Sequence, residues 1–167
     1  PESFLVVDAV GNYDAKEHEA TLFLNQSGFR SKWNDNFQSF LGKERNRRSP
    51  GLMVSPSDFI YSNTNLPGQR EDRKGVWLGR LSYQKINGSL DVFLLPVQNE
   101  TKEGLPEFKQ NKNEGALRGL YQFGGIDLSL MVGRYLGTNR AGSSVQTLLL
   151  NKYKLYYEIG TQEESVQ

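Results

Sequence analysis

Apolar and polar residues alternate with a period of two along much of this chain, and no other feature of the sequence constrains the fold as strongly. Over residues 145–159 the odd-numbered positions are mostly apolar or aromatic, whereas Lys152 and Lys154 occupy even-numbered positions. Because successive side chains of a strand point to opposite faces, this pattern predicts one long strand with one buried face. Residues 4–10 and 20–25 predict two further strands by their composition and the polar turn between them.

A first hairpin is predicted where two alternating runs flank Asn87-Gly88 within residues 75–97. This dipeptide favours the two positive φ angles of a type I′ turn. A two-residue turn there would place Ile86 opposite Ser89 and gather the apolar side chains on one face.

A second hairpin is predicted around Gly124-Gly125, with Phe123 opposite Ile126. Both hairpins carry Tyr-Gln before the turn and an acidic residue after it, a likeness that fits either an internal duplication or a resemblance common among antiparallel proteins. We prefer the second explanation.

Residues 31–41 are the exception to the strand pattern, because their apolar residues have helical spacing. These residues are Trp33, Phe37, Phe40 and Leu41. With Ser31 as N-cap and Gly42 as C-terminal stop, the segment predicts a short amphipathic helix that covers an end of the sheet. The whole chain is therefore expected to form a mainly β domain over residues 1–160, an antiparallel sandwich or partly open barrel with this one helix, and a frayed tail at 161–167.

The residue counts exclude many catalytic designs. There is no cysteine and a single histidine, His18, so cysteine nucleophiles, thiolate metal sites and two-histidine metal sites are excluded. Asp91 and Asp127 are the only suggestive carboxylate pair, and ordinary surface acids are the preferred interpretation. We expect no enzyme activity and no cofactor.

A cation site is the less favoured interpretation of an acidic cluster near the N-terminus. The cluster consists of Asp14, Glu17, His18 and Glu19. Its spacing is not that of a calcium loop, so a solvated turn is preferred and no metal is expected.

A membrane partner is not expected from the length of the apolar runs. None approaches the roughly 18 to 20 residues that a spanning helix needs. Nor does a basic segment followed by an apolar one open the sequence, so no signal peptide is expected and the compartment is left open.

Clustered cations predict the function that we favour narrowly, binding of single-stranded nucleic acid by basic loops and a mixed sheet face. The candidate residues are Lys43, Arg45, Arg47, Arg48, Arg70, Arg73, Lys74, Arg80, Phe93 and Arg118. Acidic residues within the same loops and a net charge of only +1 argue for a plain solvated surface instead.

Two other functions stay open. Strand edges and long loops, the longest at residues 98–113, would suit a structural subunit that contacts copies of itself or another protein. A barrel with a hollow interior would instead carry a small apolar ligand.

Overall fold

Strands make up nearly all of the computed structural model, which describes residues 2–14, 19–45, 59–60, 75–96, 99–100, 106–107, 114–149 and 153–163. The strands are β1 (Glu2–Asp14), β2 (Glu19–Lys32), β3 (Phe37–Glu44), β4 (Val76–Lys85), β5 (Gly88–Leu95), β6 (Asn99–Glu100), β7 (Pro106–Glu107), β8 (Glu114–Phe123), β9 (Ile126–Tyr135), β10 (Thr138–Leu149) and β11 (Tyr153–Gln162). The prediction of a mainly β, antiparallel protein is confirmed. These residues include no helix, and so none that could cross a membrane.

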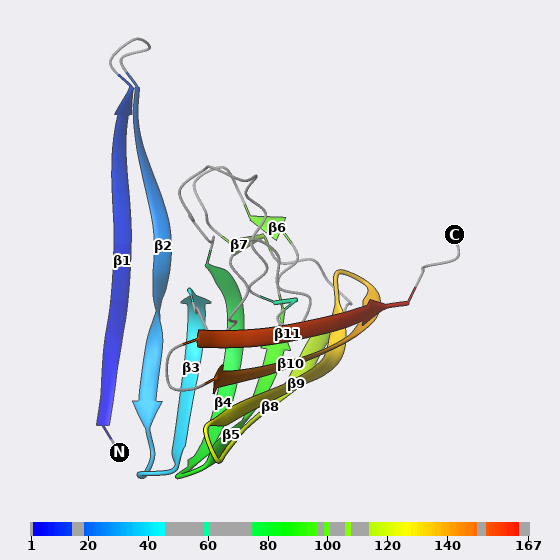
Figure 1. The fold of residues 1–167 in the computed structure, drawn as a ribbon. Helices are drawn as coiled ribbons and strands as arrows, with labels where there is room; N and C mark the ends of the chain where they lie inside the picture. Colours follow the sequence, from blue (N-terminus) through cyan, green and yellow to red (C-terminus); the bar gives the residue numbers. More distant parts are fainter. Residues whose placement is uncertain are drawn as a thin grey trace.

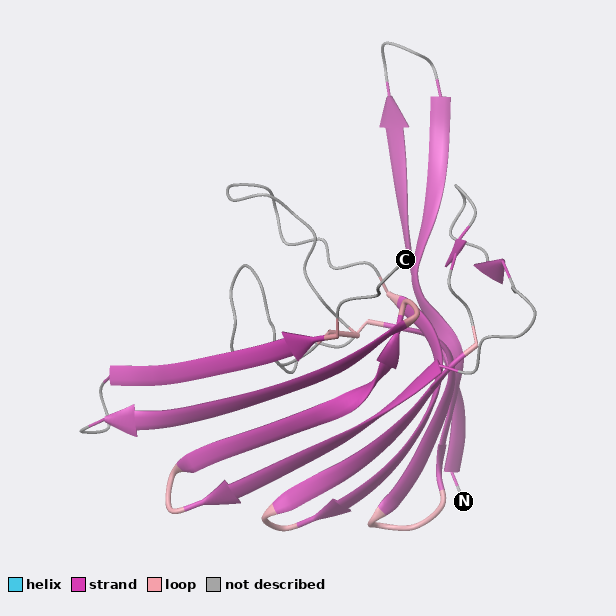
Figure 2. Cartoon of the chain, turned by 90° about the vertical axis from the view of Figure 1, so that its right-hand side faces the viewer, coloured by secondary structure: helices cyan, strands magenta, loops and turns pink. Residues whose placement is uncertain are grey.

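Nine strands form one antiparallel sheet in the order β1-β2-β3-β4-β5-β8-β9-β10-β11, while β6 pairs with β7. Figure 1 shows these strands side by side in this order, with β8 next to β5. The sheet curves into an open trough and does not close (Figure 2). It therefore has two distinct faces, an inner one on the concave side and an outer one on the convex side.

The two ends of the sheet differ in their connections. At one end, which we call the turn end, the links are residues 33–36, 86–87, 124–125 and 150–152. At the opposite end, the loop end, the links include residues 45–75 and 96–113, together with two shorter ones, 15–18 and 136–137.

The predicted register of the second hairpin is confirmed. Phe123 lies opposite Ile126, and the turn residues Gly124 and Gly125 have φ angles of 57° and 82°. Two successive positive φ angles are what a type I′ turn requires, and glycine adopts them without a steric cost.

The first hairpin forms with a register two residues away from the prediction. Gln84 rather than Ile86 lies opposite Ser89, and Ile86 and Asn87 make the turn. A shift of two residues leaves every side chain on its expected face, because the side-chain period of a strand is also two. In their hairpins Asp91 and Asp127 occupy different positions, since only Ile126 separates Asp127 from its turn, whereas Asp91 lies farther along its strand.

The predicted helix over residues 31–41 is wrong. These residues are the end of β2, a turn and the start of β3, and β3 pairs with both β2 and β4. The Asn34 side chain accepts hydrogen bonds from the backbone N–H groups of Asn36 and Phe37, at 2.9 and 2.8 Å, which stabilises the turn. Pairing on both sides of β3 outweighs the helical spacing of the aromatic residues.

The single strand predicted over residues 145–159 is in fact two strands, β10 and β11. They pair as a hairpin in which Val145 lies opposite Tyr157 and Thr147 opposite Leu155. Odd-numbered residues of β10 lie opposite odd-numbered residues of β11, and most apolar residues of both strands are odd-numbered. In the sequence the two strands therefore resemble one continuous strand. β11 continues to Gln162, past the predicted domain limit at residue 160.

The N-terminal strands form where they were predicted and are longer, since β1 and β2 pair from Glu2–Lys32 to Asp14–Glu19. Lys43, which was predicted to lie in a basic loop, belongs together with Glu44 to β3. Most of the remaining loop residues lie outside the described part of the chain.

Glycine allows close strand packing at one position of the β8–β9 ladder. A Cβ atom at Gly133 would overlap the carbonyl oxygen of Gly115 and the side chain of Ala116, whereas one at Gly119 would meet nothing within 4 Å. We expect Gly133→Ala to lower the free energy of unfolding by about 1–3 kcal/mol, the usual cost of overpacking. The matched Gly119→Ala variant should change it by less than about 0.5 kcal/mol. Urea titration followed by tryptophan fluorescence would measure both, and equal effects would contradict this account.

Candidate functional site

The outer face of the central strands is apolar and exposed to solvent. Its exposed large side chains have between 38% and 69% of their surface accessible, and they are Leu81, Tyr83, Leu90, Val92, Leu94, Leu117, Tyr121, Phe123, Ile126, Leu128, Leu130 and Val132. Gly79, Gly115 and Gly119 fill other positions on the same face. Charges occur on this face only at the margins, with Lys85 at the turn end and Arg134 at the loop end. We call this surface the outer apolar band.

Aromatic side chains collect at the turn end of the outer apolar band. Phe37 and Tyr83 pack against each other with ring centroids 4.7 Å apart. Tyr121 and Phe123 continue the row on β8, and both are more than half exposed. Tyrosine and phenylalanine thus lie along one border of an otherwise aliphatic surface.

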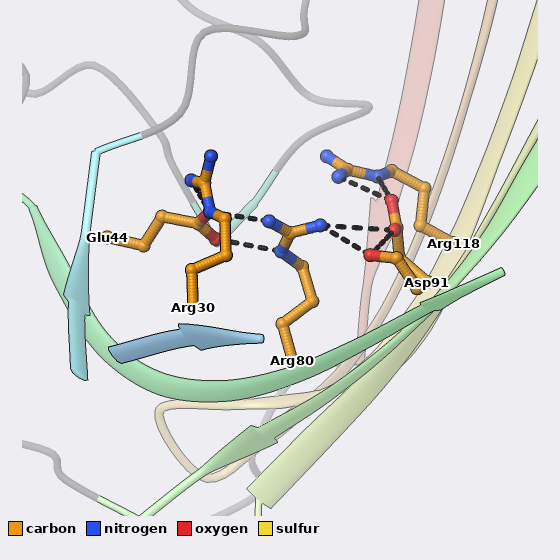
Figure 3. Close-up of polar contacts among 6 residues, drawn as sticks. Arg30, Glu44, Arg80, Asp91 and Arg118 are labelled. Atoms are coloured by element: carbon orange, nitrogen blue, oxygen red, sulfur yellow. Dashed lines mark hydrogen bonds and ion pairs between the residues drawn. The ribbon is translucent and has the colours of Figure 1, made fainter. Parts of the chain in front are cut away.

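The inner face has the opposite character, because it buries charged groups. Figure 3 shows three arginines and two carboxylates linked across β2, β3, β4, β5 and β8. The Arg80 guanidinium donates to both oxygens of Glu44, from Nε at 2.9 Å and from Nη2 at 2.6 Å. Arg80 and Glu44 are only 5% and 2% exposed. This is the fork geometry in which arginine holds a carboxylate most firmly.

A second carboxylate extends the network toward β8. The Arg118 guanidinium donates to Asp91 Oδ2 from Nε at 3.2 Å and from Nη2 at 2.8 Å. Ser82 connects the two halves, since its hydroxyl accepts from Arg80 and donates to Asp91. Asp91 is completely buried and Arg118 is 2% exposed. We call Arg30, Glu44, Arg80, Ser82, Asp91 and Arg118 the inner charge network.

Arg30 lies at the margin of this network. Its Nη2 is 3.5 Å from Glu44 Oε1, and its guanidinium lies 5.8 Å from the ring centre of Phe4 and 5.6 Å from that of Phe40. Its Nε is buried without a hydrogen-bond partner. Contact with two aromatic rings provides electrostatic compensation at such a position.

The inner face also carries an apolar cluster in which Phe59 and Ile60 pack with residues of the sheet; its sheet members are Phe40, Leu78, Phe93, Leu95, Ala116 and Met131. This cluster is interleaved with the inner charge network, because Arg80 lies opposite Phe40 and Phe93, and Arg118 lies opposite Met131. At the turn end is an open pocket of about 460 Å³ lined by both polar and apolar side chains, where Asp127 accepts hydrogen bonds from Gln122 at 2.8 Å and Gln146 at 3.3 Å.

The structure separates the residues predicted to bind nucleic acid. Arg80, Phe93 and Arg118 do share the inner face, but all are at most 5% exposed and the two arginines pair with carboxylates. Lys43 is also buried, and Arg45 is half-buried. The other predicted cations lie outside the described residues; they are Arg47, Arg48, Arg70, Arg73 and Lys74.

The structure does not bring Asp91 and Asp127 together, and it describes only part of the acidic cluster near the N-terminus. Asp91 belongs to the inner charge network, whereas Asp127 lines the pocket at the turn end. Asp14 pairs with Glu19 at the end of the β1–β2 hairpin, while Glu17 and His18 are not among the described residues. A search of the described residues finds no group of metal-ligating side chains.

Comparisons of the chain with protein-family models, with curated proteins and with solved structures find no match. The function must therefore be argued from the two faces of the sheet. Sequence reasoning identified the apolar side of both hairpins but assigned it to the core. The sequence places Arg80, Asp91 and Arg118 together on the other side, but a period of two does not indicate which of the two sides is buried.

Proposed function

We propose that this chain forms part of the wall of a closed antiparallel sheet that spans a lipid bilayer. The outer apolar band would contact the acyl chains, and the inner face would line the interior. One observation carries the proposal: apolar side chains are exposed on one face, while Arg80, Asp91 and Arg118 are buried on the other. A protein folded in water has the reverse distribution, whereas sheets in lipid face outward with their apolar side chains.

Strand length supports the proposal. β4, β8, β9 and β11 each contain 10 residues. At about 3.3 Å per residue such a strand is roughly 33 Å long, and tilted by about 40° it spans about 25 Å. That is the height of the apolar band in membrane-spanning sheets.

The ends of the sheet fit the same proposal. Membrane-spanning sheets of this kind have short turns on one side, longer loops on the other, and aromatic residues at the borders of the apolar band. Here two-residue turns at 86–87 and 124–125 lie at one end, and the connections 45–75 and 96–113 lie at the other. Phe37 and Tyr83 lie at the turn-end border.

The expectation of no membrane partner came from a criterion for helices. A helix needs an unbroken apolar run because all its sides meet lipid, but a strand presents only every second residue. Residues 117–123 show this difference, since Leu117, Tyr121 and Phe123 face outward while Arg118 faces inward. The absence of long apolar runs therefore does not argue against this proposal.

Tryptophan fluorescence tests the proposal directly. In a Trp33→Phe variant, Trp77 is the remaining tryptophan, and it lies half-buried on the outer side of β4. In vesicles of phosphatidylcholine with brominated acyl chains, we expect the lipid to quench the fluorescence of Trp77. Iodide added to the surrounding water should quench it much less than in the absence of vesicles. If iodide still quenches the fluorescence of Trp77 and brominated lipid does not, lipid contact at this face is excluded.

Binding of single-stranded nucleic acid stays a prediction, and it now depends on the loop cations rather than on the sheet face. Fluorescence anisotropy with labelled single-stranded DNA at low salt tests it, because phosphate contacts weaken steeply as salt rises. If the prediction holds, replacing Arg45, Arg47 and Arg48 together by alanine should weaken the binding and flatten its salt dependence.

A further inference from the structure

The two outermost strands of the sheet run in the same direction. All neighbours in the nine-strand order are antiparallel, so direction alternates and the first and ninth strands, β1 and β11, are parallel to each other. Joining these edges directly would need a parallel pair. Antiparallel pairing throughout a closed sheet requires an odd number of additional strands between them.

The backbone groups at the β11 edge can be assigned. The Glu163 N–H donates to the Asn139 carbonyl at 3.0 Å, so these opposed residues form a hydrogen-bonded pair. The register then makes Val145–Tyr157 and Ser143–Ile159 hydrogen-bonded pairs too. Odd-numbered residues of β11 thus direct their N–H and C=O groups toward β10, and even-numbered ones such as Tyr156 and Gly160 direct theirs away from it.

These outward-directed groups conflict with a lipid environment. Among the described residues β11 pairs with β10 alone. In the hydrocarbon region an unsatisfied backbone group is strongly destabilising, because no water is present to form a hydrogen bond with it. A sheet that faces lipid through Leu155 and Tyr157, which are 51% and 65% exposed, needs a strand on the far side of β11.

A second copy of the chain does not supply a suitable strand. Copies related by rotation about an axis along the strands would bring β1 of one copy beside β11 of the other, as a parallel pair. Pairing of β11 with β11 of another copy would be antiparallel, but it would place the loop ends of the two copies on opposite sides of the bilayer.

We propose that the β11 edge, through residues such as Tyr156 and Gly160, receives an antiparallel strand that belongs to neither β1 nor a second copy. The inference rests on the proposed membrane function. The incoming strand runs from the loop end to the turn end, with apolar side chains on the same face as Leu155 and Tyr157. Strand addition of this kind is held by main-chain hydrogen bonds.

The test measures amide hydrogen exchange of the full chain in detergent micelles by NMR. The probe is a synthetic peptide with the sequence of residues 114–123, whose side chains alternate between an apolar face and a polar one as the incoming strand requires. We expect the peptide to slow exchange at Tyr156 and Gly160 by about tenfold or more, because these amides gain partners. Exchange at Tyr157 should change little, since its amide already faces β10. No slowing at Tyr156 and Gly160 at saturating peptide would overturn the proposal.

Two variants give a matched control. Tyr156→Pro removes one edge donor and should weaken binding of the fluorescently labelled peptide, whereas Tyr156→Phe keeps the backbone N–H and should bind as the original chain does. Protection of the Tyr157 amide verifies that β11 still pairs with β10. Protection of Tyr156 that rises with protein concentration in the absence of peptide would instead show self-pairing and contradict the proposal.

The outcomes separate this inference from the proposed function. Quenching of Trp77 by brominated lipid without peptide protection leaves the membrane proposal standing and refutes the edge partner. Peptide protection without quenching supports strand addition at β11 and refutes lipid contact.

Discussion

Leu130→Arg is expected to reduce partitioning of the chain into lipid vesicles by about 30- to 1,000-fold. Leu130 lies near the middle of β9 on the outer apolar band and is 57% exposed. Arginine at the bilayer midplane of a membrane-spanning sheet costs about 2–4 kcal/mol, and about 1.4 kcal/mol corresponds to a factor of ten. Vesicle flotation at several lipid concentrations would measure the change.

Ile126→Arg is the matched control for this prediction. Ile126 lies on the same strand and the same face, but at the turn end, and it is 38% exposed. The cost of arginine falls to about 0–1 kcal/mol near the interface, so the reduction should stay below about sixfold. Equal partitioning of the two variants would mean that the outer apolar band has no depth-dependent contact with lipid.

Asp91→Ala is expected to lower the free energy of unfolding by about 3–5 kcal/mol. Asp91 is fully buried and accepts hydrogen bonds from Arg118 and Ser82. Removing one member of a buried ion pair leaves the other charge buried without compensation. Urea unfolding in detergent micelles, followed by tryptophan fluorescence, would measure the loss.

Asp127→Ala provides the comparison, because Asp127 is only half-buried and its partners are the neutral amides of Gln122 and Gln146. We expect a loss of about 1 kcal/mol there. The double variant Asp91→Leu, Arg118→Met should recover part of the stability lost in Asp91→Ala, because it removes both charges. A loss at Asp91 no larger than that at Asp127 would show that the inner charge network is solvated.

Alternation in the sequence predicted the strands well, but it does not indicate which face is buried. A period of two shows only that the two faces differ, and water is the usual surrounding for the polar one. Here the polar face carries Arg80, Asp91 and Arg118, which satisfy one another after β4, β5 and β8 have come together. Those pairings depend on residues far apart in the sequence and could not be read from it.

Turn chemistry predicted one register and missed the other for a physical reason. Gly124 and Gly125 adopt the positive φ angles that fix a two-residue turn, and the register followed. At Asn87-Gly88 neither residue has a positive φ, so the dipeptide did not determine the turn. The prediction of a helix over residues 31–41 was wrong for a different reason. The spacing of apolar residues within a short segment carries no information about the pairing of β3 with β2 and β4.

The two-residue error in the first hairpin shows what the outer apolar band leaves undetermined. Sliding β4 by two residues against β5 would still direct Leu81 and Tyr83 outward, and lipid or detergent would hardly distinguish the two alignments. The inner charge network would distinguish them, because the same slide would carry Arg80 away from Glu44 and Asp91 together. The apolar surface thus accepts several alignments of the strands, and the buried charges decide which of these alignments is adopted.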